Sequence, residues 1–343
     1  MRQAVIFGGM SYEHEISIVS AISLKDVLNY ELEFIFLDSN RGFYHIPATN
    51  MKSNFFSKGG YKKCDVLTLK HGGFYKKSIF GEKQLEVSTI INLVHGGDGE
   101  DGKLSSIFEF FNIPFIGPRL EASVLSFNKL YTKLYAKELG VKVIDYQLLA
   151  NGDRELKLPL PVIIKPARLG SSIGVSIVKE ASELDYALDV AYEFDHVLVV
   201  EPFIDGVKEY NLAGAFTDDF IFSIVEEPQK SDFLDFDKKY LDFSRTQQVL
   251  KADIKNELEV KMQDSFKTIY NELFKGSIIR CDFFVVDNEV YLNEINPIPG
   301  SYANYLFEDF NQVVKSLSEN LPRYKSISID YQYINSIVKA KGK

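Results

Sequence analysis

Short apolar runs, glycine-containing loops and helical patterns alternate in the first third of the chain, and this alternation constrains the fold most. AVIF at 4–7 predicts a strand that opens into the loop GGMSYEHE, and 14–29 then has helical spacing of apolar side chains. FIFLD at 34–38 and TIINLV at 89–94 predict two further strands, and 101–112 predicts a helix. Units of this kind predict a parallel α/β sheet.

Two further regions follow. The second carries a helix at 128–140, strands in PVIIKP and HVLVVEPF, and the loop RLGSSIG between them. The third is richer in strands and of α+β character, with a helix at 253–274. Its polar, aromatic stretch at 228–248 predicts a mobile flap, with a disordered surface loop as the alternative. The expected domains are 1–117, 118–206 and 207–343.

The composition and the apolar pattern of the chain argue against several classes of protein. The chain has 343 residues and a net charge of −9, which argues against broad binding to nucleic acid or to a membrane surface. Its start lacks the apolar region of a signal peptide, and its apolar runs are too short to span a bilayer. The two cysteines, Cys64 and Cys281, exclude a zinc site built on cysteines. We expect a soluble cytoplasmic protein.

The loop GDGEDG at 97–102 fits the glycine pattern of dinucleotide-binding proteins. An NAD-dependent oxidoreductase is therefore one hypothesis. However, Asp98, Glu100 and Asp101 would repel a pyrophosphate. A tight turn with acidic residues at the start of a helix explains the loop better on local grounds.

A second loop suits a phosphate better. In KPARLGSSIGVS, Lys165 ends a strand, and Gly170, Ser171, Ser172 and Gly174 form a flexible turn rich in hydrogen-bond donors. Such a turn can surround an anion, with Lys165 and Arg168 supplying positive charge. A surface hairpin is the alternative.

Charged and amide side chains also alternate on two consecutive strands. Arg280 and Asp282 share a face of one strand, and Glu294 and Asn296 share a face of the next. A three-residue loop at 287–289 would set Asp282 opposite Glu294, whereas a two-residue loop would put the pairs on opposite faces. Carboxylate and amide oxygens suit Mg²⁺, and Arg280 could neutralise developing charge. A salt-bridged sheet face is the alternative.

Eight segments together resemble the ATP-grasp ligases, and within them the D-alanine–D-alanine ligases. They are GGMSYEHEIS, VHGGDGEDGKL, KLYTK, LPVIIKPARLGSSIGVS, VLVVEPFIDGVKE, KKYLD, RCDFFV and NEINPIPGS. The resemblance implies three domains, a homodimer, and ATP with two Mg²⁺ or Mn²⁺ ions. It also implies that two D-alanines are joined through an acyl phosphate for peptidoglycan precursor synthesis. Another carboxylate–amine ligase, or one that takes D-serine or D-lactate second, is the alternative.

The resemblance also implies a role for each matching residue. Catalytic roles fall on Glu13, Ser171, Tyr240, Arg280 and Gly300, with Ser171 bonded to both Glu13 and Tyr240. Substrate binding falls on His95, Tyr305 and Leu306. ATP binding falls on Lys129, Lys165, Gly170, Ser172, Glu201, Phe203, Ile204, Glu209 and Lys239. The metal ligands would be Asp282, Glu294 and Asn296.

The sequence departs from the family pattern in three places. Pro202 stands where a lysine often contacts adenine, and Asn128 replaces a common aspartate. Tyr305 occupies the place of a serine that helps to bind the second substrate.

Overall fold

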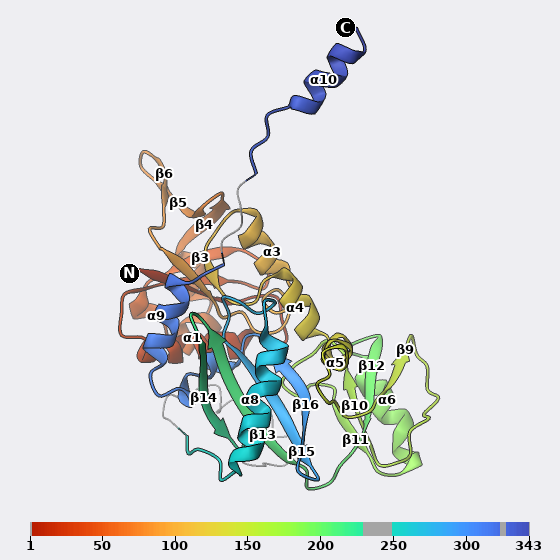
Figure 1. Cartoon of the computed structure of the whole chain (residues 1–343). Coiled ribbons are helices and arrows are strands. Elements are labelled where there is room, and N and C mark those ends of the chain that lie inside the picture. Colours follow the sequence, from red (N-terminus) through yellow and green to blue (C-terminus); the bar gives the residue numbers. More distant parts are fainter. Residues whose placement is uncertain (1, 229–248, 323–326, 343) are drawn as a thin grey trace.

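The computed structural model describes residues 2–228, 249–322 and 327–342, and it contains three β-sheets (Figure 1). The largest sheet is built from the N-terminal part of the chain and has the strand order β6-β5-β4-β3-β2-β1-β7-β8. Its strands are β1 (Gln3–Gly8), β2 (Leu32–Leu37), β3 (Phe43–Ile46), β4 (Asp65–Lys70), β5 (Gly73–Ser78), β6 (Gly81–Gln84), β7 (Thr89–Asn92) and β8 (Phe115–Ile116).

Only half of this sheet is parallel, so the predicted parallel sheet was incomplete. Strands β2, β1, β7 and β8 pair in parallel, whereas β3 to β6 pair antiparallel. The links between β4, β5 and β6 are tight turns of two residues, and such turns can join only antiparallel neighbours. The 43–84 segment lacks the long apolar runs that identified the other strands.

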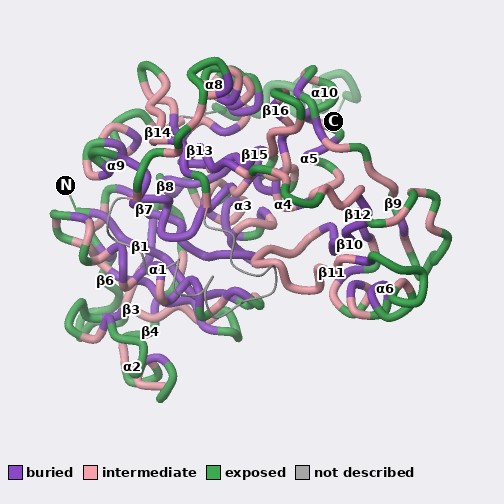
Figure 2. The backbone as a smooth tube through the Cα atoms, turned by 90° about the horizontal axis from the view of Figure 1, so that it is seen from below, coloured by how far each residue is buried: buried purple, intermediate pink, exposed green. Residues whose placement is uncertain are grey.

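Helices cover both faces of the first sheet. On one face α1 (His14–Val27) packs together with residues from near the C-terminus, which include α9 (Phe310–Glu319). On the other face α3 (Lys103–Phe110) buries Leu104 and Phe108. Helix α9 therefore completes the core of the N-terminal sheet, although it lies close to the C-terminal end of the chain (Figure 2).

The two smaller sheets are four-stranded and largely antiparallel. One has the order β11-β10-β12-β9 and the other β14-β13-β15-β16. Their strands are β9 (Gln147–Ala150), β10 (Val162–Pro166), β11 (Ser176–Val178), β12 (Val197–Pro202), β13 (Lys208–Phe216), β14 (Phe220–Glu226), β15 (Ile279–Val286) and β16 (Glu289–Asn296). Helix α6 (Leu184–Tyr192) packs on the first of these sheets and α8 (Asn256–Tyr270) on the second.

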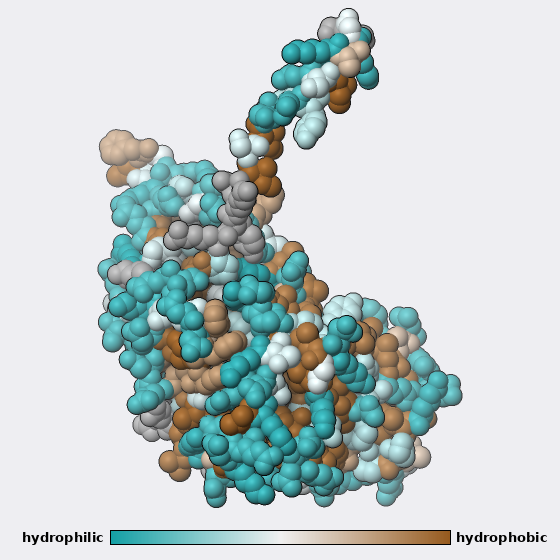
Figure 3. Space-filling view, viewed as in Figure 1, coloured by the Kyte–Doolittle hydropathy of each residue, from teal (hydrophilic) through white to brown (hydrophobic). Residues whose placement is uncertain are grey.

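The remaining elements are short or peripheral. Helices α4 (Leu120–Phe127) and α5 (Lys129–Glu138) connect the first sheet to the other two. The others are α2 (Ser53–Ser57), α10 (Gln332–Ala340) and the 3₁₀ turns Ala48–Asn50, Gly60–Lys63, Ala181–Glu183 and Gly300–Leu306. Helix α10 stands apart from the body with apolar side chains exposed (Figures 1 and 3). Across the described ranges, no helix is long and apolar enough to cross a bilayer.

The hairpin of β15 and β16 does not have the expected three-residue loop. Val286 pairs with Glu289, so the turn has only two residues, Asp287 and Asn288, both with positive φ. This turn type suits asparagine and aspartate. Farther along, Asp282 pairs with Glu294 and Phe283 with Leu292, which leaves Asn293 as the extra residue of a β-bulge. The bulge restores the register that a two-residue turn alone would have reversed.

Candidate active site

The carboxylate of Glu13 lies where three loops meet. Glu13 precedes α1, and its Oε1 accepts a 2.6 Å hydrogen bond from Ser171 Oγ in the glycine–serine loop after β10. A Cβ on Gly170 would lie 2.9 Å from both carboxylate oxygens, and one on Gly96 would lie 2.6 Å from Oε2. Two glycines from different sheets therefore leave the space that this side chain fills. The expected contact between Ser171 and Glu13 is present.

His95 is buried behind this carboxylate and is tied to the C-terminal part of the chain. Its Nδ1 lies 2.9 Å from the carbonyl oxygen of Ile298, and its Nε2 lies 3.0 Å from Ser20 Oγ. Burial lowers the pKa of His95 to about 4. The imidazole is therefore neutral near pH 7, with one nitrogen positioned to donate to the Ile298 carbonyl.

Two carboxyl groups near His95 are difficult to ionise. Burial, with a smaller contribution from Glu100, raises the pKa of Glu13 to about 7. Burial also raises the pKa of Glu100 to about 8. A cation placed against Glu13 would stabilise its charged form, so this end of the site suits an ammonium group.

The glycine–serine loop has the backbone conformation of an anion-binding turn. Ser171 and Ser172 have φ of 54° and 58°, which non-glycine residues rarely adopt. Lys129 Nζ donates to the carbonyl oxygen of Leu169 at 2.6 Å, so this ammonium group lies beside the loop. Strain of this kind persists only where the surroundings impose it, and it is concentrated at functional sites.

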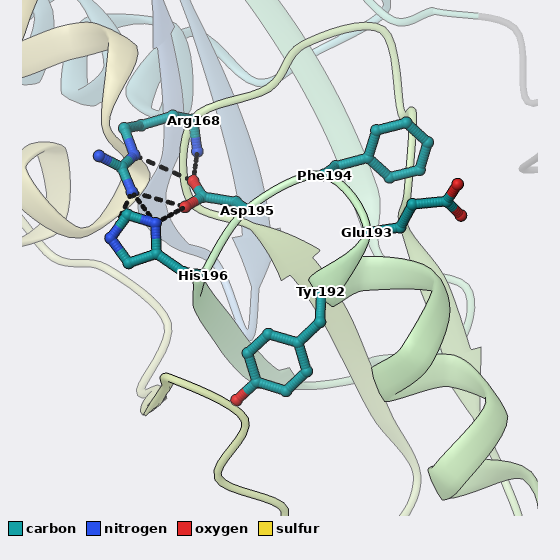
Figure 4. A pocket seen from close by; sticks show the side chains of 6 residues that line it. All are labelled: Arg168, Tyr192, Glu193, Phe194, Asp195 and His196. Atoms are coloured by element: carbon teal, nitrogen blue, oxygen red, sulfur yellow. Dashed lines mark hydrogen bonds and ion pairs between the residues drawn. The ribbon is translucent and has the colours of Figure 1, made fainter.

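Arg168 was expected to supply positive charge to this loop, but its guanidinium group pairs with Asp195 instead. Its guanidinium donates to both oxygens of Asp195, at 3.0 and 2.5 Å, on the wall of an open pocket of about 390 Å³ (Figure 4). Phe194 on the same wall makes an edge-to-face contact with Tyr12, with ring centroids 5.5 Å apart. Arg168 therefore holds the segment at 192–196 beside the loop.

Charged groups on the sheet of β14, β13, β15 and β16 form the opposite side of the site. Arg280 donates to both oxygens of Asp282, at 2.7 and 2.8 Å, and Asn296 Nδ2 donates to Asp282 at 3.0 Å. Glu294 lies opposite Asp282 in the strand pairing and 3.9 Å from Lys129 Nζ. The four side chains therefore share one face, as the strand alternation predicted.

Glu209 on β13 shares this face, because its neighbour Asn211 pairs with Asp282. Burial, and then the charges of Asp282 and Glu294, raise the pKa of Glu209 to about 7. Burial acts to lower the pKa of Arg280, but Asp282 outweighs it, and the pKa of the guanidinium is raised. An acidic surface with an arginine and lysines beside it suits a metal-bound polyphosphate.

A left-handed turn follows this surface. Gly300 is buried, and Ser301, Tyr302 and Ala303 all have φ near +50°. The Tyr302 hydroxyl donates to the carbonyl oxygen of Asn92 at 2.5 Å, which fastens the turn to β7. Left-handed residues normally occur singly, so no sequence pattern indicates this run of three.

The other expected site residues lie in the core, directly after β12, or outside the described residues. Tyr305 and Leu306 are both buried in the core cluster that includes α1. Phe203 and Ile204 follow β12, where the Phe203 amide donates to the carbonyl oxygen of Pro161 at 3.0 Å. Lys239, Tyr240 and nearly all of the flap at 228–248 lie outside the described residues.

Three residues near the site have no assigned role in the sequence analysis. Asn293 Oδ1 accepts from Lys165 Nζ at 3.3 Å, Ser20 contacts His95, and Lys133 contacts Glu201. Asn293 reaches the site through the bulge, which no alternation pattern reveals. Lys133 had a visible signal, because it lies one helical turn after Lys129.

The expected metal ligands are consistent with a hard divalent cation in their chemistry. Asp282 and Glu294 face one another from paired strands, and Asn296 touches Asp282. Within the described ranges, no three His, Cys, Asp or Glu side chains are arranged as a complete metal site by themselves. Any bound cation would therefore need ligands from an amide, water or a phosphate, as Mg²⁺ commonly has.

Comparisons with known proteins agree across the whole chain. Residues 2–118 match the family model described as D-ala D-ala ligase N-terminus, and 136–312 match D-ala D-ala ligase C-terminus. The chain is 62% identical over 345 residues to the D-alanine--D-alanine ligase of Wolinella succinogenes, and 56% identical to that of Helicobacter hepaticus, with full coverage of both chains in each case.

Solved structures agree as well. The crystal structure of D-Alanine-D-Alanine Ligase from Helicobacter pylori is similar with a TM-score of 0.85 and 52% identity, and covers 95% of this chain and 100% of that one. The VanG D-Ala:D-Ser ligase from Enterococcus faecalis is more distant, with a TM-score of 0.74, 28% identity, and coverage of 92% and 98%.

Proposed function

Because this chain belongs to the D-alanine–D-alanine ligase family, we propose that it joins two D-alanines at the expense of ATP. The chain spans relatives of this name from end to end at 56–62% identity. The contact between Glu13 and Ser171 is the structural observation that supports the proposal most. The contact brings a buried carboxylate, which we assign to the ammonium group of the first D-alanine, next to a loop suited to phosphates. The oxidoreductase hypothesis is not favoured, because the family match extends through the GDGEDG loop.

The reaction has two steps in this proposal. The carboxylate oxygen of the first D-alanine attacks the γ-phosphorus of ATP, the bond to the β-phosphate oxygen breaks, and ADP leaves. The amine of the second D-alanine, after losing a proton, then attacks the carbonyl carbon of the acyl phosphate. The bond from that carbon to the phosphate oxygen breaks, and inorganic phosphate and the dipeptide are released.

In this proposal, charged and neutral residues bind different groups of the substrates. Glu13 holds the first ammonium group, and Lys129, Lys165, Gly170 and Ser172 contact the ATP phosphates. Arg280 and the Gly300 amide donate to the oxyanion of the tetrahedral intermediate, where preorganised donors lower the barrier. Neutral His95 and Tyr305 lie at the carboxylate ends of the two substrates, with Leu306 supporting Tyr305 from the core.

Asp282, Glu294 and Asn296 would hold the divalent cation. When bound, Mg²⁺ or Mn²⁺, as two ions, would neutralise phosphate charge during transfer. Phe203, Ile204 and Glu209 would surround the nucleoside, and Glu201, whose two oxygens bond Lys165 and Lys133, would act on ATP through these lysines. Lys239 and Tyr240, with the flap at 228–248, would close the site so that water does not hydrolyse the acyl phosphate. We further propose the domains 1–117, 118–206 and 207–343, a cytoplasmic location, and a homodimer.

Phosphate release tests the proposed function directly. Protein, ATP and Mg²⁺ are incubated with D-alanine, with L-alanine, or without an amino acid, and the dipeptide is identified by mass. We expect release with D-alanine alone. Parallel reactions with D-alanine plus D-serine or D-lactate test the second substrate. If folded, ATP-binding protein releases no phosphate in response to D-alanine, the proposed function is wrong.

A further inference from the structure

Lys133, one helical turn after Lys129 on α5, is completely buried. Its side chain is 1% exposed, and its ammonium group lies 2.8 Å from Glu201 Oε1. A charged lysine is almost never buried to this extent without a specific partner. Lys133 also donates to the carbonyl oxygen of Ile144 at 3.3 Å, so its position is fixed by two contacts.

Glu201 is shared between two lysines. Its Oε2 accepts from Lys165 Nζ at 2.8 Å, while its Oε1 faces Lys133. The carboxylate is 3% exposed, so no surface charge or solvent competes with this arrangement. Each oxygen of Glu201 is therefore occupied by one ammonium group, and the three side chains carry a net charge of +1.

The second lysine changes what Lys165 can offer to a phosphate. A carboxylate paired with Lys165 alone would form a neutral buried pair, and the pair would attract an anion only weakly. With Lys133 also bound to Glu201, the cluster keeps one unit of positive charge next to the glycine–serine loop. At low local dielectric this difference is much larger than it would be in water.

We propose that Lys133 is a positioning residue for nucleotide binding, which neutralises Glu201 and so leaves the positive charge of Lys165 for the phosphates of ATP. Lys133 does not itself touch the nucleotide in this proposal. The inference refines the proposed function, since it concerns the same ATP site. Its primary readout is ATP binding without D-alanine, so it can fail or succeed independently of the ligase reaction.

The test is a charge-balance experiment on the full chain. Lys133→Met keeps the length and the apolar stem but removes the ammonium group. We expect the dissociation constant for ATP with Mg²⁺ to rise about tenfold, the size of one lost charge-assisted interaction. In turnover assays, KM for ATP should rise more than kcat falls, and KM for D-alanine should change little.

The decisive variant is the double substitution Lys133→Met with Glu201→Gln, compared with each single change. Removing both charges restores the net +1 of the cluster, so ATP affinity should return to within about threefold of the wild type. Lys137→Met is the matched control, because Lys137 lies on the next turn of α5, is 47% exposed, and pairs with Asp145. It should leave ATP affinity unchanged.

Thermal unfolding of every variant separates this role from a structural one. If Lys133→Met lowers the melting temperature but leaves ATP affinity unchanged, the proposal is wrong. It is also wrong if ATP affinity falls and Glu201→Gln does not restore it, because simple disruption of packing would not be reversed by a second substitution.

Discussion

Ser171 Oγ donates a 2.6 Å hydrogen bond to Glu13 Oε1, and this contact joins the first loop of the N-terminal sheet to the glycine–serine loop of another sheet. Any ligand that binds between the two must displace or share this bond. The region that the proposal gives to the first amino acid is thus coupled to the region that it gives to the phosphates. Substitution of the glycines around this contact can therefore test the coupling.

Gly170→Ala should weaken the binding of D-alanine more than the binding of ATP. Its Cβ would lie 2.9 Å from both Glu13 oxygens, so the carboxylate must move. We expect KM for D-alanine to rise about tenfold or more, because a small displacement of a positioning group has a large effect on catalysis. The dissociation constant for ATP should change less. Steady-state kinetics with each substrate varied would test this, and an ATP effect larger than the D-alanine effect would contradict it.

Asp282→Asn should remove turnover and also weaken the fold. The substitution leaves the buried Arg280 without its anionic partner, and breaking a buried pair costs about 3–5 kcal/mol of unfolding free energy. Asp287→Asn is the matched control, since Asp287 lies in the exposed turn of the same hairpin with positive φ, which asparagine tolerates. Denaturant unfolding and phosphate release should both be normal in the control. Normal turnover in Asp282→Asn would disprove the metal assignment.

Tyr302→Phe should destabilise the protein by about 1–3 kcal/mol, because the carbonyl oxygen of Asn92 would lose its buried donor. The same hydroxyl holds the left-handed turn that carries Gly300, so kcat should also fall. Tyr186→Phe, whose residue is 75% exposed on α6, should change neither quantity. The idea fails if both variants unfold at the same denaturant concentration as the wild type.

Stability of the ligand-free protein should decrease as the pH rises toward 8. Burial raises the pKa of Glu100 from its ordinary 4.5 to about 8, so the native state holds a proton that the unfolded state releases. The stability linked to this proton is fully present below pH 4.5 and is lost as the pH rises through about 8. Glu100→Gln should make the fall of the melting temperature between pH 6 and 8 less steep, and Glu13 and Glu209, whose pKa values are raised to about 7, account for the remaining slope. An unchanged slope in that variant would show that Glu100 is ionised at neutral pH.

Much of the fold could be predicted because its central strands are continuous apolar runs. The strands at 4–7, 34–38 and 161–166, and the helices at 14–29 and 128–140, lie within a few residues of the observed elements. The region 43–84 was not predicted, since its strands are short, half-exposed and rich in lysine. Helix α9 was also not predicted, although its buried residues Phe310, Val313 and Leu317 have the spacing of one helix face. Nothing local indicates that this face completes the N-terminal core.

The candidate site was predictable where motifs place side chains directly. The alternation of Arg280 with Asp282 is such a case, and the loop with Ser171 is another. The geometry that depends on contacts between distant segments could not be predicted from the sequence. The bulge at Asn293, the burial of Lys133 and the left-handed turn at 301–303 arise only when the sheets pack together.

The two-residue turn and the bulge of the last hairpin act together, and this sets how the chain tolerates insertions and deletions. Removing Asn293, or lengthening the turn at 287–288 by one residue, would change the strand pairing by one position without breaking the hairpin. In the hairpin of β5 and β6, whose turn residues Ile79 and Phe80 are almost fully exposed, the same change would alter no candidate site residue. An affinity tag or a fluorescent peptide can therefore be inserted at 79–80, whereas the length of 283–296 should be kept.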